Sequence, residues 1–237
     1  MTISSSLRRP RRLAALTAAG GVAMLAAFTA APAQADVEQG PENGVRIYLS
    51  QACHNRGGPE CAPNFGCFGY DENAGSAAIA RAAAGHFAAR GYRVRIGDGL
   101  TENNISNSNA FGAVIHIPIH SNAGTEDCSS TNAAQGGTQV LHYGGAGDDQ
   151  LAGIMTQEVG ALSPGTSDHP VVRTDLGEIT DTSARAAYLE SAFHTFGSDV
   201  EFLSNPDGWA DRIAEAVDRC LGAPRDGALT RTKECTW

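Results

Sequence analysis

Short apolar runs recur along the chain and predict five β-strands. The clearest is AVIHIPI at residues 113–119, where four of the seven residues are β-branched, which is typical of a strand covered on both faces. His120 ends this strand, and a small polar loop, SNAG, follows it. The other runs lie at residues 44–50, 92–96, 138–143 and 186–192.

Stretches with helical periodicity separate these strands. In residues 71–90, Ile79, Ala83 and Phe87 recur at intervals of four and share one face of a helix that we expect Asp71 to cap. The other predicted helices are 101–111, capped by Thr101, 148–162, capped by Asp148 and Asp149, and one that opens at Asn205-Pro206-Asp207 and runs to about Leu221.

Strands that alternate with helices predict an α/β fold. We expect a single domain over residues 36–237, with a mostly parallel, twisted sheet and helices on both faces. Residues 36–43 are expected to be a loose lead-in, and residues 163–185 a long polar loop. In such a sheet the carboxyl ends of the strands share one edge, where ligands bind, so residues that follow strands are the first candidates for chemistry.

Residues 1–35 predict a secretory signal peptide. A basic head with four arginines precedes an uncharged, Ala-rich stretch that closes with Ala33-Gln34-Ala35, a small-x-small cleavage pattern. We expect cleavage after Ala35 and export by the Sec route, or by the twin-arginine route because the arginines are paired. The alternative is a membrane anchor, since an uncharged run of this length can span a bilayer. Pro32, the small residues and the cleavage pattern favour the signal peptide, and we expect no stable membrane association after cleavage.

The mature chain is strongly acidic. The whole chain has 17 Lys and Arg against 26 Asp and Glu, a net charge of −9. The leader removes four arginines and no acidic residue, so 13 basic residues remain against 26 acidic ones and the mature charge is −13. Nucleic-acid affinity depends on neutralised phosphates, so this charge excludes nucleic acid as a partner. It favours a substrate that is neutral, cationic or recognised locally.

All six cysteines follow the leader, which suggests three disulfides in an exported chain. Proximity in the sequence favours Cys61 with Cys67, Cys220 with Cys235, and therefore Cys53 with Cys128. A structural zinc site is the alternative, but the chain lacks a CxxC pair.

Four polar side chains fall at or near the predicted carboxyl edge. His54 follows the first strand, Glu72 opens the first helix and His120 ends the third strand. Two imidazoles and one carboxylate form a common ligand set for a hydrolytic zinc that keeps a position open for water. Glu190, in a late apolar strand, is a candidate to move the proton of that water.

Spacing alone does not select these four over the remaining histidines. We expect His86 on the surface of its helix and His116 behind His120 or in the core. His142 and His169 are expected to be structural or to lie in loops on the substrate side. His194 is the strongest competitor for a catalytic role, because it can orient a substrate or stabilise an oxyanion.

Five segments stand in a recognisable order along the chain. They are VRIYLSQACHNRGG, DENAGSAAIARAA followed by GYRV, LTENNISNSNAFGA, IHSNAG, and YLESAFHTFGSDVEFLSNPDGW. In this order the chain resembles the zinc-dependent N-acetylmuramoyl-L-alanine amidases often called amidase-3, over nearly all of residues 44–221. The IHSNAG loop is the most specific of the five segments.

The resemblance implies an amidase/phosphorylase-hydrolase-like fold with a Zn²⁺ cofactor. By this resemblance His54, Glu72 and His120 match the zinc ligands, and Glu190 matches the catalytic glutamate. The implied reaction is hydrolysis of the amide between the lactyl group of muramic acid and L-alanine of the stem peptide. Peptidoglycan or muropeptides are then the partners, and we expect a monomer that is secreted or associated with the cell wall.

The chain also departs from the family pattern. SQACHN stands where the family usually has an Asp-Pro-Gly-His-Gly-Gly type of loop, and Asn104 replaces a common arginine. Arg173 and Arg185 are both candidates for the arginine that precedes the glutamate strand. Phe193-His194 replaces the more usual Gly-Phe. We expect His194 and Asn122 to bind the substrate, through the oxyanion that forms at the scissile carbonyl.

Two other functions fit the same residues. A zinc peptidase or carboxypeptidase on a related fold would release a C-terminal amino acid, whereas an amidase frees the N-terminus of L-alanine. A non-catalytic cell-wall-binding protein would bind wall fragments without cleaving them. The presence of all three ligand types together with Glu190 favours an enzyme.

Overall fold

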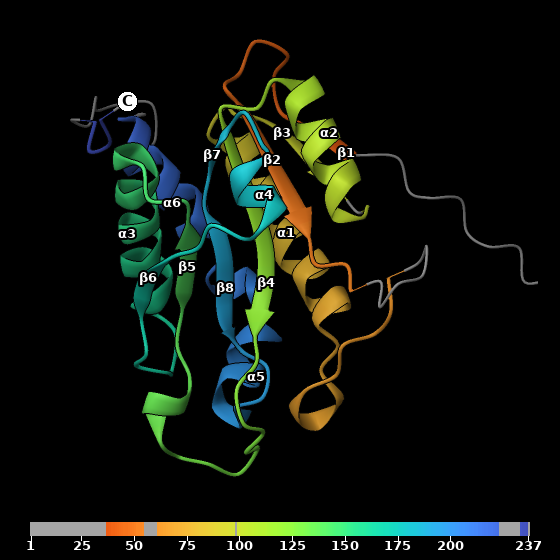
Figure 1. The fold of residues 1–237 in the computed structure, drawn as a ribbon, viewed down its shortest axis with the longest axis vertical. Helices are drawn as coiled ribbons and strands as arrows, with labels where there is room; N and C mark the ends of the chain where they lie inside the picture. Colours follow the sequence, from red (N-terminus) through yellow and green to blue (C-terminus); the bar gives the residue numbers. More distant parts are fainter. Residues whose placement is uncertain (1–36, 55–60, 98, 223–232, 237) are drawn as a thin grey trace, which may run out of the picture. The chain divides into compact units, whose positions relative to one another are not determined.

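The computed structural model describes residues 37–54, 61–97, 99–222 and 233–236. The predicted signal peptide at residues 1–35 lies outside them and stays a prediction. None of the helices in these ranges combines the length and the apolar character needed to cross a bilayer. One sheet with helices on both faces forms the domain, so the predicted α/β class is confirmed (Figure 1).

The described residues form a sheet of eight strands. Its order is β1 (Val37–Gln39), β3 (Arg93–Gly97), β2 (Arg46–Gln51), β4 (Ile115–Asn122), β8 (Tyr188–Phe193), β5 (Gln139–His142) and β6 (His169–Val172). β7 (Arg185–Ala186) pairs with the start of β4 and lies off this path. The five predicted strands correspond to β2, β3, β4, β5 and β8.

The centre of the sheet is parallel, as predicted, but its margins are not. β2, β3, β4 and β8 run in one direction, whereas β5 is antiparallel to β8 and β1 is antiparallel to β3. A parallel crossover needs a long connection, usually a helix. The segment from β4 to β5 contains only a short 3-10 turn (Ala133–Gln135), so the chain turns back from the carboxyl edge and enters β5 in the opposite direction.

The side chains of β4 divide between the two faces of the sheet. Ile115, Ile117 and Ile119 are fully buried in the main core, together with Ile79 and Phe87 of the first long helix. The alternate residues of β4 point to the opposite face, because the side-chain period of a strand is two. This alternation carries the histidines of β4 out of the main core.

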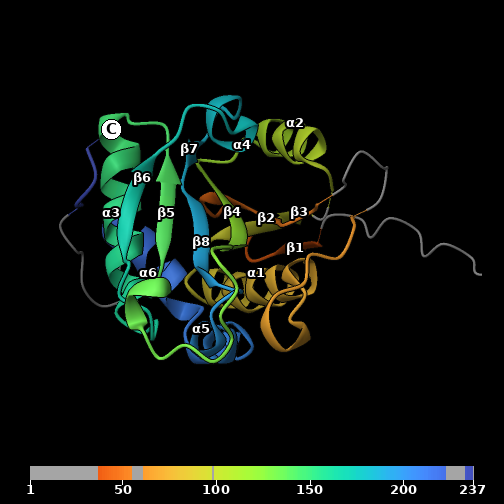
Figure 2. The ribbon, with the colours of Figure 1, turned by 60° about the horizontal axis from the view of Figure 1, so that its bottom comes forward.

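Helices cover both faces. α1 (Glu72–Ala89) and α6 (Asp211–Leu221) pack together on one face, and α2 (Thr101–Phe111) and the short α4 (Gly177–Thr180) lie on the other (Figure 2). α3 (Ala146–Gly160) packs on α6 and β5, and α5 (Gly197–Leu203) follows β8. Asp71 caps α1 as predicted, because its side chain accepts a hydrogen bond from the backbone N–H of Asn73.

Several predicted boundaries are wrong. Thr101 is the first residue of α2 rather than its cap, and α3 begins at Ala146, ahead of the aspartates expected to cap it. The last helix begins at Asp211, after a 3-10 turn. Residues 36–43 contain β1, and residues 163–185 contain β6, α4 and the start of β7. These short elements are stabilised by pairing with neighbours, which local patterns do not reveal.

Two of the three predicted disulfide pairings are wrong. The structure pairs Cys53 with Cys61 and Cys67 with Cys128, and it confirms Cys220 with Cys235. Cys61 lies beside Cys53, with a Cα–Cα distance of 4.7 Å, and the N–H of Ala62 donates to the carbonyl oxygen of His54 at 2.6 Å. Cys67 is then left to reach the loop after β4, with a Cα–Cα distance of 5.3 Å.

We expect replacement of Cys67 and Cys128 by Ser to lower the free energy of unfolding by about 4 kcal/mol, because this disulfide closes a loop of 61 residues. The matched control is the Cys220/Cys235 double Ser variant, which opens a loop of 15 residues and should lose about 3 kcal/mol. Urea unfolding of the two variants and the wild type measures both changes. A smaller loss for the longer loop would contradict the expectation.

Candidate metal centre

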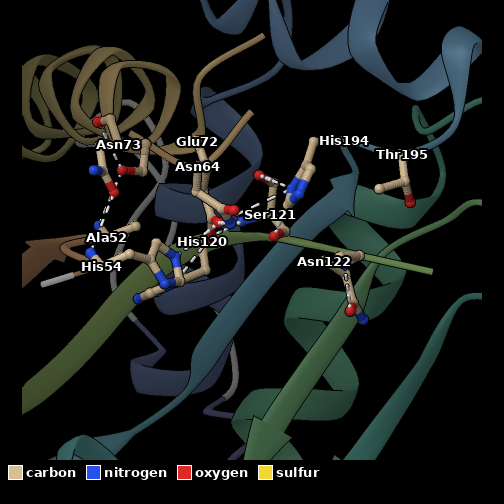
Figure 3. A network of polar contacts seen from close by, with 12 residues as sticks. Ala52, His54, Asn64, Glu72, Asn73, His120, Ser121, Asn122, His194 and Thr195 are labelled. Atoms are coloured by element: carbon tan, nitrogen blue, oxygen red, sulfur yellow. Dashed lines mark hydrogen bonds and ion pairs between the residues drawn. The ribbon is translucent and has the colours of Figure 1, made fainter. Parts of the chain in front are cut away.

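Three of the predicted site residues meet at the carboxyl edge of the sheet. His54 lies in the loop after β2, Glu72 is the first residue of α1, and His120 lies in the last part of β4. Their possible ligand atoms all lie within 4.8 Å of one another. Figure 3 shows the three side chains turned toward one another.

Glu72 lies at the centre of the cluster, and each of its oxygens has two close partners; Oε2 also lies 4.0 Å from Nδ1 of His194. Oε1 lies 3.0 Å from Nδ1 of His120 and accepts the backbone N–H of Ser121 at 3.0 Å. Oε2 lies 2.8 Å from Nε2 of His54 and accepts the side-chain amide of Asn64 at 2.6 Å. The carboxylate is therefore fixed in position by groups from three separate segments.

The surroundings of Glu72 keep it ionised. Burial by itself raises the pKa of this carboxyl. The hydrogen bonds from His120 and His54, the charge of His120 and the N–H of Ser121 outweigh burial and hold the pKa well below its usual range. The cluster thus contains one buried negative charge facing two imidazole nitrogens.

The start of α1 also fixes the loop that carries His54. Asn73 Oδ1 accepts the backbone N–H of His54 at 3.4 Å, and Ser76 Oγ accepts that of Ala52 at 2.9 Å. The Cys53–Cys61 disulfide ties the same loop to its own return segment. One helix end therefore presents Glu72 and positions His54.

Glu190 lies directly across from His120, because the two residues are register partners in β8 and β4. Its Oε2 is buried and receives no hydrogen bond from any described residue. Burial raises the pKa of Glu190 to about 7; the charges of His120 and Glu72 act on it in opposite directions. A carboxyl with this pKa can both take up and release a proton near neutral pH.

Tyr188 supports His120 from the same strand as Glu190. Its ring stacks on the imidazole of His120, with the ring centroids 4.5 Å apart and the planes inclined by 24°. Tyr188 and Glu190 are two residues apart in β8, so they share a face of the sheet. The stacking restricts the orientation of the His120 ring.

His194 is buried beside the cluster and bonded to Ser121. Its Nδ1 lies 3.0 Å from the backbone oxygen of Ser121 and 2.9 Å from its hydroxyl. A carbonyl oxygen only accepts, so Nδ1 carries the hydrogen in this arrangement. Burial lowers the pKa of His194, which favours the neutral ring, and in that ring Nε2 is an acceptor.

Asn122 does not join the cluster. Its side-chain amide donates to Gln139 Oε1 at 2.9 Å, and its oxygen accepts the N–H of Ala123. Figure 3 shows the side chain directed away from His54 and His120.

The other histidines lie away from the three clustered residues. His116 is fully buried behind His120, with its Nε2 3.0 Å from Ser50 Oγ. His142 is buried and pairs with Asp149, and His169 is exposed in β6. His86 is half-buried in the last turn of α1 rather than fully on its surface.

Three further residues of the site are not among those predicted from the sequence. The sequence pattern could have indicated Tyr188, since it precedes Glu190 by two positions in a strand and so shares its face. The pattern indicates Ser121 more weakly, through its position directly after His120. Asn64 lies in an irregular loop, and no periodicity relates it to Glu72.

The residues present fit a bound divalent metal ion such as zinc. Two imidazoles and one carboxylate from separate segments are a donor set that zinc prefers when it keeps a position open. Donor atoms around a tetrahedral ion with bonds of about 2.0–2.2 Å lie roughly 3.3–3.6 Å apart. His54 and His120 contact different oxygens of Glu72, at 2.8 and 3.0 Å, and one donor atom from each of the three residues lies within 4.8 Å of the others, so modest movements reach this spacing.

No family model and no curated protein matches the sequence. Among solved structures, the domain is similar to an N-acetylmuramoyl-L-alanine amidase from Clostridium difficile 630, with a TM-score of 0.62 and 17% identity over 74% of this chain and 95% of that chain. It is also similar to the catalytic domain of CwlV, an N-acetylmuramoyl-L-alanine amidase from Bacillus (Paenibacillus) polymyxa var. colistinus, with a TM-score of 0.62 and 15% identity over 76% and 99% of the two chains. For the amidase AmiC2 of Nostoc punctiforme the TM-score is 0.61 and the identity 15%, over 73% and 94%. The expected amidase-type fold is thereby confirmed.

Proposed function

We propose that this chain is a zinc-dependent N-acetylmuramoyl-L-alanine amidase that cleaves the amide between muramic acid and L-alanine in peptidoglycan. The single observation that carries the proposal is the cluster of His54, Glu72 and His120, in which Glu72 and His120 are buried, with Glu190 as the register partner of His120 on the neighbouring strand. The solved structures that share the fold bear the names of amidases of this kind, which supports the same reaction.

His54, Glu72 and His120 would hold the zinc. When bound, the ion supplies a Lewis acid for the amide carbonyl and lowers the pKa of a coordinated water toward about 7. The protein's own contribution begins with Glu72, whose ionised carboxylate and fixed position prepare the donor set before the metal arrives.

Glu190 would act as the general base and then as the general acid. Its raised pKa of about 7 allows the carboxylate to take a proton from the attacking water and return it to the leaving amine of L-alanine. The buried Oε2 has no hydrogen-bond partner among the described residues, so it is available for this transfer.

His194 would bind the substrate as an acceptor. Since its Nδ1 is committed to Ser121, a neutral ring offers only the lone pair of Nε2. This arrangement suits an N–H of the stem peptide better than a negatively charged oxygen, so we assign His194 to peptide positioning. Asn122 would reach the substrate only after exchanging its bond to Gln139.

We further propose that the enzyme acts outside the cytoplasm as a monomer. Three disulfides in the described residues support an oxidising compartment, since such bonds are rare in the cytosol. This agrees with the predicted signal peptide and with a substrate in the cell wall.

Metal analysis combined with product analysis tests the proposal. We expect about one zinc per wild-type chain, loss of zinc in His120→Ala, and retention of zinc in His169→Ala, which removes an exposed histidine. Mass spectrometry of digested muropeptides should detect peptides with a free L-alanine N-terminus, and chelation should abolish their release. A released C-terminal amino acid would identify a carboxypeptidase instead. Absence of zinc in the wild type after reconstitution, or binding without cleavage, would overturn the proposal.

A further inference from the structure

A small cavity opens beside the metal centre on the face of the sheet covered by α2 and α4. It has a volume of about 180 Å³, and its lining includes His54, His120 and Glu178. Tyr188 and Asn104 also line it. A substrate group that enters this cavity therefore lies close to the scissile bond.

Glu178 is a buried carboxylate on the cavity wall. The residue comes from α4, and only 5% of its surface is exposed. Its Oε1 accepts a hydrogen bond from Ser50 Oγ at 2.6 Å and lies 3.3 Å from His116 Nε2. Among the described residues no hydrogen bond reaches Oε2, which leaves this oxygen for a group in the cavity.

The described lining of the cavity lacks a cationic partner for this carboxylate. The side chains beside Glu178 are uncharged or imidazole groups, and none of the described lining residues is a lysine or an arginine. Burying a carboxylate is costly unless a cation or several donors compensate for the lost water. Ser50 and His116 contact only Oε1 of Glu178. A bound cation would provide a partner for Oε2.

The size of the cavity limits what enters. Pockets that hold a complete drug-sized ligand have volumes of about 300–1,000 Å³, so a cavity of about 180 Å³ is smaller than such a pocket. This volume admits a short aminoalkyl chain or one edge of an amino sugar, but not a complete sugar with its peptide. The occupant is therefore a single amine-bearing substituent of a larger substrate.

We propose that Glu178 is a specificity-determining residue that binds an ammonium group of the substrate, so that the preferred substrates are muramoyl peptides with a free amine near the scissile amide. This inference rests on the proposed amidase function and names the substrate class within it. The ammonium group has two possible sources, an amino sugar that lacks its acetyl group or a diamino acid of the stem peptide. The charge-assisted hydrogen bond to Oε2 is the same for both.

Matched synthetic muramoyl peptides test the proposal. One pair differs only in whether the sugar amine is free or acetylated, and a second pair only in whether a lysine side chain in the peptide is free or acetylated. For the wild-type enzyme we expect kcat/KM to be about tenfold higher for the free amine in one of the pairs, and that pair identifies the source. In Glu178→Gln, which keeps the size and an acceptor for Ser50, this ratio should fall to about one. Glu42→Gln, a control at an exposed residue, should keep the wild-type ratio.

The ratio of kcat/KM values within a substrate pair distinguishes an effect on specificity from an effect on folding, and the activity on all four substrates tests the proposed function. A purely structural role for Glu178 would lower kcat/KM equally for both members of a pair and leave the ratio unchanged, which overturns the inference. A wild-type enzyme that cleaves all four substrates without preference also overturns it, while the amidase function stands. If the wild type cleaves none of the four, the proposed function itself fails.

Discussion

Glu190→Gln is expected to retain zinc and to lower kcat by about 10²–10⁴-fold. The amide has the shape of the carboxylate, so the pairing of β8 with β4 and the stacking of Tyr188 on His120 should persist. It cannot accept and return a proton, which is the role that burial and the pKa of about 7 suit Glu190 to perform. Single-turnover rates on a muropeptide, with zinc measured in the same samples, give both quantities.

Glu201→Gln provides the matched control, because Glu201 is an exposed residue of α5. Its kcat and zinc content should equal those of the wild type. A Glu190→Gln enzyme that is fully active would show that another group carries the proton. Loss of zinc from that variant would show instead that Glu190 belongs to the ligand set.

The position of the candidate metal site could be predicted from the sequence because the centre of the sheet is parallel. His54 and His120 each follow or end a strand, and strands that run in one direction end at one edge. Glu72 is predicted to join them because it is the first residue of α1, and the sequence predicts Asp71 as the cap of this helix. The side-chain alternation of β4 likewise separates Ile115, Ile117 and Ile119 from the histidines of the same strand.

Features that depend on contacts between residues far apart in the sequence could not be predicted in this way. The direction of β5 depends on how the irregular segment after β4 returns to the sheet, and its residues have no periodicity that specifies this. The pairing of Cys67 with Cys128 depends on the fold of two loops, so proximity in the sequence favoured the wrong partner. Asn64 and Glu178 reach the site from loops or short helical turns, where hydrogen bonds between remote residues decide the geometry.

Glu72→Gln is expected to weaken zinc binding by more than about 100-fold and to reduce activity to background at limiting zinc, since even outer groups of metal sites contribute 10–100-fold. The substitution removes the buried negative charge but keeps a carbonyl oxygen that can accept the N–H of Ser121. Competition with a chromogenic chelator measures the affinity. Glu102→Gln, at an exposed position in the first turn of α2, is the matched control and should bind zinc as the wild type does.

The two substitutions together separate metal binding from proton transfer. Glu190→Gln should lose turnover with zinc in place, whereas Glu72→Gln should lose turnover because zinc is absent, and only the second should recover in part at high zinc concentration. The metal-free wild type is the reference for folding, and its near-ultraviolet circular dichroism should match that of metal-free Glu72→Gln. Wild-type zinc affinity in Glu72→Gln would contradict the assignment of Glu72 as a ligand. The buried carboxylate between His54 and His120 would then be a structural acceptor that orients the two rings.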